Sequence, residues 1–450
     1  MSLKDLGVDE PCKYLGIDED VAHKGDLNKE KVMKEYFTRL RKIWSSELNS
    51  RNKIQAHNTF ATPLLLPTFG ILSWTKEEIE AIDIRTRKLL TMNGSFHRNS
   101  DIDRLYAPRS VAGRGLNSIL DAYYLRLITL AHHVRVRAKV NRFLAKVCQH
   151  ETDRLLRLAD DLILAIGVTL PSHDIETAHL STDIKAKLQE GHTKAWTEKP
   201  MHGYNKRQAD KTLNRDPTAS HAWTRSLSLT SHLEFYLCAI QEQEIPTRHL
   251  QKMRSLNPSA VNSQCRHCAE NPETINHIVG SCPALSSGMY LPIRHNAVAK
   301  TLYNEILRLE KPDKAFVNPP PVMHEGTLEM WWDAKISTVP ATEFNRPDIV
   351  TWNHATKKCM VIEVSVPLDF NAARVEVEKR DKYMPLIIGL KRLYPTFEFE
   401  AISVVLGAMG LVSSSIKGQL AKIGFKAKRI ESIVRLLQEK ALLGTIKIVK

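Results

Sequence analysis

The stretch NRPDIVTWNHATKKCMVIEVSVP (345–367) decides the fold of the C-terminal part of the chain. Residues 348–353 and 358–366 are rich in β-branched side chains and partly alternate between apolar and polar, which is typical of β-strands. Polar residues separate the two segments, as at a turn. The sequence therefore predicts a β-hairpin.

Two acids occupy matching positions in this hairpin. An even-length turn centred midway between Asp348 and Glu363 pairs Val350 with Val361 and sets the two acids opposite each other. Directly opposed strand positions bring side chains to about 5 Å, where one divalent cation can take an oxygen from each carboxylate. Mg²⁺ or Mn²⁺ there would relieve the repulsion between the acids, activate water and neutralise charge on a phosphodiester.

Two further side chains could complete a catalytic group. Lys379 and Tyr383 lie four residues apart in a predicted helix at 372–394, so they share one face. Lys379 could orient the water or stabilise the pentavalent oxyanion. The alternative is structural, because carboxylates on exposed strand faces and solvated, charged helix faces are common.

The segments around the hairpin predict an α/β domain. Pro385 is expected to kink or end the first part of the helix, and 397–407 is expected to form a third strand. A candidate helix at 324–336 precedes the hairpin. Glu325 or Glu329 on that helix could supply a further acid, although a solvated helix face also explains both.

Upstream, CRHCAENPETINHIVGSC (265–282) has the spacing C-x2-C-x8-H-x4-C, formed by Cys265, Cys268, His277 and Cys282. Three thiolates and an imidazole at such spacings fit a tetrahedral zinc ion. Because four protein ligands leave no open position for a substrate, the predicted zinc is structural. The alternative is a chance cluster of reduced cysteines.

The connectors between these ligands also predict local structure. Asn271 before Pro272 could cap a short helix that runs through Ile278, and Gly280 could supply a left-handed residue at its end. His267, between the first two cysteines, is a weaker competing ligand.

Composition restricts the partners. The chain has 450 residues, 64 Lys and Arg against 50 Asp and Glu, and a formal charge of +14, which favours a polyanionic partner such as nucleic acid. We find neither a secretory signal nor an apolar run of about 18 residues, so no membrane association is expected. An intracellular location follows.

The N-terminal half is predicted to be helical. Apolar residues recur at helical spacing over 27–58, 76–92, 116–166 and 221–254. Strands are expected only after the proline-rich segment 318–322. The predicted fold is therefore a multi-domain α+β protein.

At this point the motifs resemble a known family. The order of the Cys3His cluster, RHNAVAKTLYNEI (294–306), NRPDIV (345–350), VIEVSVPLD (361–369) and EKRDKY (378–383) is similar to the C-terminal part of the polyprotein of site-specific non-LTR retrotransposons with a restriction-like endonuclease. The segment 69–116 resembles the family's reverse transcriptase thumb.

The resemblance implies four regions: a thumb-like helical region (1–130), a helical and basic linker (131–255), a CCHC zinc knuckle (256–292) and an endonuclease domain with a PD-(D/E)xK-type nuclease fold (293–450). No paired-aspartate polymerase signature occurs in the sequence, so we do not expect this chain alone to copy RNA. The implied partners are target DNA, element RNA and a polymerase half in cis or in trans, and the implied location is the nucleus.

The resemblance also implies residue roles. Asp348 and Glu363 would bind the catalytic Mg²⁺ or Mn²⁺, with Lys379 as the displaced basic residue and Tyr383 one turn on. The usual motif has lysine two residues after the second acid, where this chain has Ser365. Lys382 is the competing candidate. A non-catalytic nucleic-acid-binding remnant or domesticated protein is the alternative hypothesis, and a helical scaffold is a third.

Overall fold

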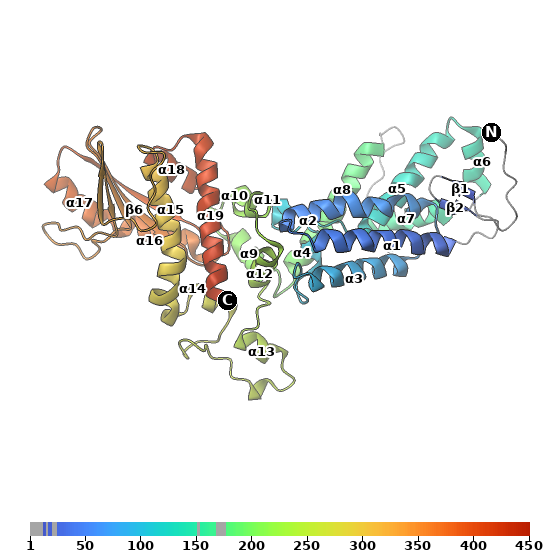
Figure 1. Ribbon diagram of the computed structural model, residues 1–450, viewed down its shortest axis with the longest axis horizontal. Coiled ribbons are helices and arrows are strands. Elements are labelled where there is room, and N and C mark those ends of the chain that lie inside the picture. Colours follow the sequence, from blue (N-terminus) through green and yellow to red (C-terminus); the bar gives the residue numbers. More distant parts are fainter. Residues whose placement is uncertain (1–11, 15–16, 20–24, 151–153, 168–176) are drawn as a thin grey trace. The chain divides into compact units, whose positions relative to one another are not determined.

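The computed structural model describes the chain except residues 1–11, 15–16, 20–24, 151–153 and 168–176. The chain divides into two compact units (Figure 1). The first unit comprises Met1–Trp196 and Ser228–Phe235, and the second comprises Thr197–Leu227 and Tyr236–Lys450. The predicted linker 131–255 is thus shared between the units, and the Cys3His segment belongs to the same unit as the sheet.

The first unit is a helical assembly. Its elements are α1 (Gly25–Trp44), α2 (Ser50–Ala56), η1 (His57–Ala61), η2 (Thr62–Leu64), η3 (Leu66–Gly70), α3 (Lys76–Met92), α4 (Ile102–Tyr106), η4 (Arg109–Val111), α5 (Ile119–Ala138), α6 (Arg142–His150), α7 (Arg154–Ile166), most of α8 (Thr177–Glu198) and the start of α12 (Ser231–Gln241). Among the described residues, no helix has the length and apolar composition needed to cross a membrane.

The helical spacing of apolar residues in α1 creates the core of this unit. Tyr36, Leu40 and Trp44 fall on one face and are fully or almost fully buried. They pack in one cluster with Ile79 and Leu90 of α3. A capping box at Thr75 fixes where α3 begins, so its apolar face is presented to α1.

A short hairpin precedes α1 and corrects the prediction that strands occur only after 318–322. β1 (Cys12–Tyr14) pairs antiparallel with β2 (Ile17–Glu19). The two residues between the strands lie outside the described part of the chain. Three-residue strands are too short to show a period of two in the sequence, which explains why the pattern was missed.

A buried ion-pair network ties the segment 228–235 to the rest of the first unit. Glu234 accepts hydrogen bonds from Ser50 Oγ at 2.7 Å, from Arg109 at 3.0 and 3.1 Å, and from Arg114 Nε at 3.0 Å. Burial alone would raise the pKa of Glu234, but the two guanidinium groups and Ser50 lower it from 4.5 to about 2. The carboxylate is therefore charged and fully paired at neutral pH.

Replacing this acid should destabilise the first unit strongly. We expect Glu234→Gln to lower the free energy of unfolding by about 3–5 kcal/mol, because two buried guanidinium groups lose their counter-ion. Since the folded pKa lies below the unfolded value, the contribution of Glu234 should be complete above pH 4.5 and lost as the pH falls toward 2. Urea unfolding at several pH values measures both effects.

Glu190→Gln is the control, because its ion pair with Lys187 is exposed. The expected change for that variant is at most about 1 kcal/mol. Equal unfolding midpoints for the two variants would show that the buried network does not stabilise the unit.

The second unit is built around one sheet. Its strands are β3 (Val322–Glu325), β4 (Leu328–Trp332), β5 (Ile349–Asn353), β6 (Lys358–Ser365) and β7 (Glu398–Val405). Its helices are the end of α12, α9 (Tyr204–Lys211), α10 (Pro217–His221), α11 (Trp223–Ser226), α13 (Arg248–Arg254), η5 (Pro258–Ala260), α14 (Ile275–Gly280), η6 (Pro283–Leu285), η7 (Ser286–His295), α15 (Asn296–Leu307), η8 (Asp369–Asn371), α16 (Ala372–Lys382), α17 (Met384–Leu393), α18 (Ile416–Ile423) and α19 (Ala427–Val449).

The strand order is β3-β4-β5-β6-β7, in which β3 to β6 form an antiparallel meander and β7 runs parallel to β6. The parallel step needs a crossover, which α16 and α17 supply. Successive side chains of β5 and of β6 point alternately into two cores, one on each face of the sheet. Ile362 of β6 packs with α15, α18 and α19, whereas Val361 packs with α17. Figure 1 shows α15 and α19 side by side on one side of the sheet.

The structure corrects one predicted helix and confirms one predicted break. The segment 324–336 is not helical, because β3 and β4 form a hairpin across Gly326, whose φ of 57° a glycine adopts without strain. The helix 372–394 does break as predicted: α16 ends at Lys382, and Pro385 lies in the first turn of α17.

Candidate functional site

The first candidate site is the Cys3His cluster. The ligand atoms of Cys265, Cys268, His277 and Cys282 all lie within 4.8 Å of one another. Cys265 Sγ and Cys282 Sγ are 3.9 Å apart, and Cys268 Sγ lies 3.3 Å from His277 Nε2. Tetrahedral zinc with bonds of about 2.3 Å to sulfur requires sulfur atoms about 3.8 Å apart. The cluster could therefore hold a metal ion such as zinc.

Short local elements position these ligands. Thr274, and not Asn271, caps α14, since its hydroxyl accepts the backbone N–H of His277 at 3.1 Å. Gly280 is the last helical residue and does not adopt a left-handed conformation. It is needed for packing, because a Cβ there would lie 2.9 Å from Leu368 Cγ. His267 is exposed and lies outside the ligand cluster.

The protonation of the ligands suits a metal. Backbone N–H groups of Glu270 and Asn271 lower the pKa of the Cys268 thiol, whereas burial raises that of Cys282 to about 11. Burial lowers the pKa of His277, which keeps its imidazole neutral and able to ligate. A bound ion would stabilise the Cys282 thiolate that burial alone disfavours.

The cluster is fixed to the second unit by buried polar contacts. The Tyr290 hydroxyl accepts the N–H of Cys282 at 3.1 Å and donates toward the carbonyl of Ile278 at 2.8 Å. Arg294 Nη1 donates to the carbonyl of Val279 at 2.7 Å. These bonds hold α14 against the elements that lead into α15, so the Cys3His cluster is part of the body that contains the sheet.

We expect the purified chain to bind one zinc ion per molecule through these four ligand atoms. His277→Ala should lose the ion, because only three of the four ligands remain. Metal content after dialysis, measured by mass spectrometry, tests this. His267→Ala is the matched control and should keep the ion, because His267 lies outside the cluster. Equal zinc content in both variants would contradict the assignment.

The second candidate site is the acid pair. The structure confirms the predicted register, since Val350 pairs with Val361 and Ile349 with Ile362. The same register places Asp348, immediately before β5, opposite Glu363. Asp348 lies two residues before Val350, and Glu363 lies two residues after Val361, so each acid points to the same side of its strand as that valine. Both valines pack with α17. The two carboxylates therefore belong to the same face of the sheet.

Asp348 is held by two contacts to one oxygen. Its Oδ2 accepts the backbone N–H of Val364 at 2.8 Å and lies 3.2 Å from His295 Nε2. His295 Nδ1 faces Asn296 Oδ1 at 3.0 Å. Although burial lowers the pKa of His295, Asp348 and Asn296 raise it to about 9. Both ring nitrogens therefore donate, and an imidazolium pairs with the carboxylate.

Glu363 is buried and also pairs through one oxygen. Lys379 Nζ lies 2.6 Å from Glu363 Oε1, and Lys382 Nζ lies 3.4 Å from the same atom. Both candidate lysines of α16 thus reach the acid, and Lys379 is the closer. The other carboxylate oxygens, Oε2 of Glu363 and Oδ1 of Asp348, form no salt bridge among the described residues.

Tyr383 lies against this group but is suited to donate, not to act as a base. Its hydroxyl donates to the carbonyl of Arg346 at 3.1 Å and is 3.1 Å from Lys382 Nζ. Burial and the carboxylates of Glu363 and Asp348 raise its pKa. The phenol is therefore protonated at neutral pH.

Neither acid considered as a further ligand lies at this site. Glu325 pairs with Lys311 and Lys314, and Glu329 pairs with His354. Glu329 is opposite Trp352, at the other end of β5 from Asp348. Trp332 of β4 pairs with Ile349 of β5, so one further step along both strands places Asp333 opposite Asp348. The backbone N–H of Asp333 donates to the carbonyl of Asp348 at 2.9 Å.

Sequence reasoning did not single out His295 or Asp333. His295 lies 53 residues before Asp348, so no local pattern joins them. A signal was present for Asp333, because the register of β4 against β5 would have revealed it had 324–336 been recognised as a hairpin. The Gly-Thr pair at 326–327, between apolar Val322 and Met323 on one side and Leu328 and Met330 on the other, was that signal.

Comparison with known proteins adds no assignment. No protein-family model matches the chain, and no curated protein matches it either. A functional hypothesis therefore depends on the geometry of these two sites.

Proposed function

We propose that the chain is the C-terminal part of a non-LTR retrotransposon reverse transcriptase and endonuclease, with a PD-(D/E)xK-type nuclease domain that nicks target DNA by metal-dependent hydrolysis. The observation that carries the proposal is the alignment of Asp348 and Glu363 across β5 and β6 with Lys379 Nζ 2.6 Å from Glu363. The lysine comes from the helix after the hairpin, where the resemblance expects it.

The acid pair fits a hard divalent cation. Each carboxylate uses one oxygen for its own cation, so Asp348 and Glu363 each have a second oxygen that could face Mg²⁺ or Mn²⁺. When bound, such an ion supplies an activated water and neutralises charge on the phosphodiester. The two acids fit such an ion because they offer carboxylate oxygens and lie opposite each other across β5 and β6.

The chain's own groups would bind the substrate phosphate and hold the acid pair in place. Lys379 and Lys382 place two ammonium groups beside Glu363, where they can pair with a phosphate oxygen and stabilise the charge that develops on it. The N–H of Val364 fixes the Asp348 carboxylate relative to β6. Tyr383 holds the loop at Arg346 through its hydroxyl.

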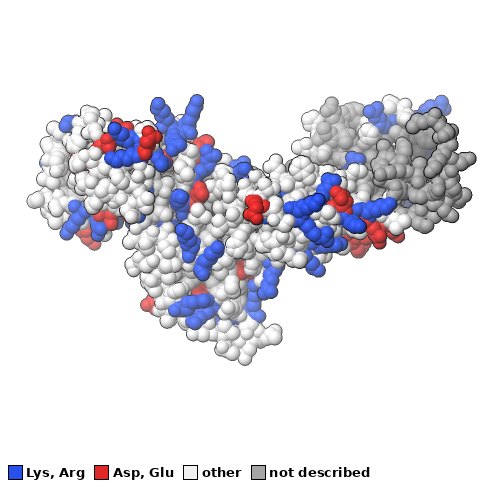
Figure 2. All heavy atoms as spheres, in the orientation of Figure 1, with Lys and Arg blue, Asp and Glu red and all other residues white. Residues whose placement is uncertain are grey.

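Positive charge supports a nucleic-acid partner. Figure 2 shows Lys and Arg side chains at many points of the visible face, with Asp and Glu between them. Lys426 and Lys428 at the start of α19 are exposed and form no ion pair with the described residues. Target DNA and element RNA are the proposed partners, a polymerase half in cis or in trans is the proposed companion, and the nucleus is the proposed location. The knuckle would then stiffen a phosphate-binding surface.

A second candidate function is nucleic-acid binding without cleavage. It is favoured by the ion pairs themselves, because His295 and Lys379 already neutralise both acids. A remnant or domesticated protein would keep such a stable arrangement after losing its reaction. Dependence of cleavage on metal separates the two candidates.

We expect the purified chain to nick supercoiled plasmid in Mg²⁺ or Mn²⁺, and Asp348→Ala and Glu363→Ala each to lower the rate at least about a hundredfold, since each removes a proposed metal ligand. Lys379→Ala should lower it by about ten- to a hundredfold and more than Lys382→Ala, because Lys379 is the closer cation. Conversion of supercoiled to open circular DNA over time gives the rates.

Glu325→Ala is the matched control, because Glu325 is an acid of the same sheet that pairs with Lys311 and Lys314 away from Asp348. It should cleave like the parent. DNA affinity should not fall in Asp348→Ala, Glu363→Ala or Glu325→Ala, whereas Lys379→Ala and Lys382→Ala each lose a proposed phosphate contact and should bind DNA somewhat less tightly. A folded, zinc-loaded parent that binds DNA but does not nick it with either metal would favour the binding function.

A further inference from the structure

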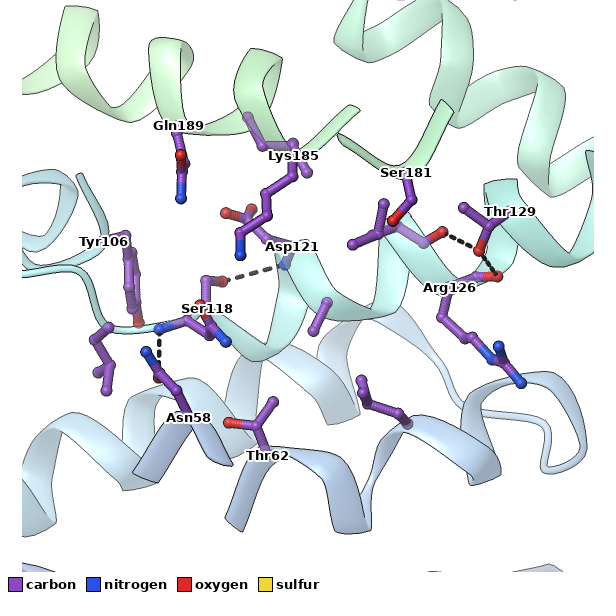
Figure 3. Close-up of a pocket in the computed structure, with 16 residues that line it drawn as sticks. Asn58, Thr62, Tyr106, Ser118, Asp121, Arg126, Thr129, Ser181, Lys185 and Gln189 are labelled. Carbon is purple, nitrogen blue, oxygen red and sulfur yellow. Dashed lines mark hydrogen bonds between the residues drawn. The ribbon is translucent and has the colours of Figure 1, made fainter. Parts of the chain in front are cut away.

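The first unit contains a cavity that the proposed nuclease does not use. It lies between η1–η2, α5 and α8, and its volume is about 280 Å³ (Figure 3). Pockets for small ligands begin at about 300 Å³. The cavity lies at the lower end of this range, so it suits one small ligand or one residue of a polymer, and it is too small for a duplex.

The wall of the cavity is preformed. Asn58 Nδ2 donates to the carbonyl of Gly115 at 2.9 Å, and Asn58 Oδ1 accepts the N–H of Asn117 at 3.0 Å. Asp83 accepts the hydroxyl of Ser118 at 2.9 Å and also caps the next two N–H groups of α5. Because Asp83 already occupies the N-terminus of α5, an anionic ligand must bind to side chains elsewhere in the cavity.

Two cations from opposite walls remain available for such a ligand. Arg126 of α5 and Lys185 of α8 both line the cavity and are exposed. Neither forms an ion pair with a carboxylate of the described residues. Figure 3 shows the Lys185 side chain extending from α8 into the cavity toward α5.

The acid in the cavity has a cationic partner. Asp121 Oδ2 lies 2.9 Å from His192 Nε2, and His192 Nδ1 lies 2.8 Å from Asp103 Oδ1. Since both ring nitrogens face carboxylates, His192 donates from both and carries a positive charge. This group of one imidazolium and two carboxylates keeps one negative charge. Arg126 and Lys185 add two positive charges, so the cavity has a net charge of +1 and favours an anionic ligand.

The remaining lining suits a flat, polar ring attached to the anion. Leu125 and Leu188 present apolar surface, while Gln189, Ser181 and Thr129 offer an amide and hydroxyl groups. A fatty acid would leave these polar groups without partners in the bound state. A heteroaromatic base with a sugar and a phosphate satisfies both kinds of surface.

We propose that this cavity binds one unpaired nucleotide of a single-stranded nucleic acid, with its phosphate against Lys185 and its base between Leu125 and Leu188. The inference rests on the proposed nucleic-acid partner but not on cleavage. RNA and DNA strands share the phosphate and the base, so the experiment uses both.

Fluorescence anisotropy of the full chain with short labelled single strands of RNA and of DNA, over a series of salt concentrations, tests the site. We expect Lys185→Ala to weaken single-strand binding about tenfold, because a charge-assisted contact is lost. The slope of log affinity against log salt should fall by about 0.7, the share of one phosphate contact. Lys187→Ala is the matched control, since Lys187 lies on α8 outside the cavity and pairs with Glu190.

A neutral variant separates the cavity from general surface charge. Ala122 lines the cavity on α5, so Ala122→Leu should fill part of it and weaken single-strand binding without changing the salt slope. Circular dichroism shows whether this variant keeps the parent's fold, and Ala122→Ser provides a smaller substitution if it does not. A labelled duplex should bind all variants alike, because the cavity cannot take it.

The outcomes distinguish this site from the proposed function. A parent that binds single strands, with Lys185→Ala and the Ala122 variant binding as tightly as Lys187→Ala, overturns the cavity alone. Preference for RNA over DNA would support the site and assign the sugar hydroxyl a role. A parent that binds no nucleic acid at low salt overturns both the cavity and the proposed partner, whereas loss of nicking alone leaves the cavity standing.

Discussion

The register between β5 and β6 is the constraint on which the rest of the second unit depends. Side chains of a strand alternate between faces, so a slip of one residue would exchange the two cores. Ile362 would then leave the α15 and α19 side, and Glu363 would enter it in place of an aliphatic side chain. An unpaired carboxylate in that core is costly. The burial of apolar residues on both faces of the sheet therefore fixes Glu363 opposite Asp348 without any need for contacts between the acids themselves.

The Cys3His cluster and the acid pair are joined by two consecutive residues. Arg294 donates to the carbonyl of Val279 in α14, and a Cβ on Gly444 of α19 would lie 2.8 Å from the Arg294 Cα, so the arginine backbone is clamped against that helix. His295 follows directly and reaches Asp348. A disturbance of the Cys3His cluster that moved Arg294 would therefore also move the imidazolium that holds Asp348. The Cys3His cluster is thus part of the framework of the acid pair.

Local patterns predicted what local contacts build. The hairpin register and the Cys3His cluster each involve residues within a short stretch, and both are present as expected. The break at Pro385 follows from the missing N–H of proline in the same way. The prediction of a helix at 324–336 was wrong because the local sequence did not decide between helix and strand. Burial of Leu328 and Met330 in the core on one face of the sheet selects the strand. The contacts of His295 and the cavity beside Lys185 join distant segments, and only tertiary packing creates them.

Charge compensation explains why the acid pair is stable in the folded chain. Two ionised carboxylates on neighbouring strands repel each other, and burial of Glu363 strengthens that repulsion by lowering the local dielectric constant. The chain answers with one cation for each acid, His295 for Asp348 and Lys379 for Glu363. Each cation takes a single oxygen, so both acids are paired while their other oxygens remain outside these ion pairs. Compensation of this kind is compatible with the proposed divalent-cation site, and it accounts equally for the persistence of the same geometry in a protein that only binds nucleic acid.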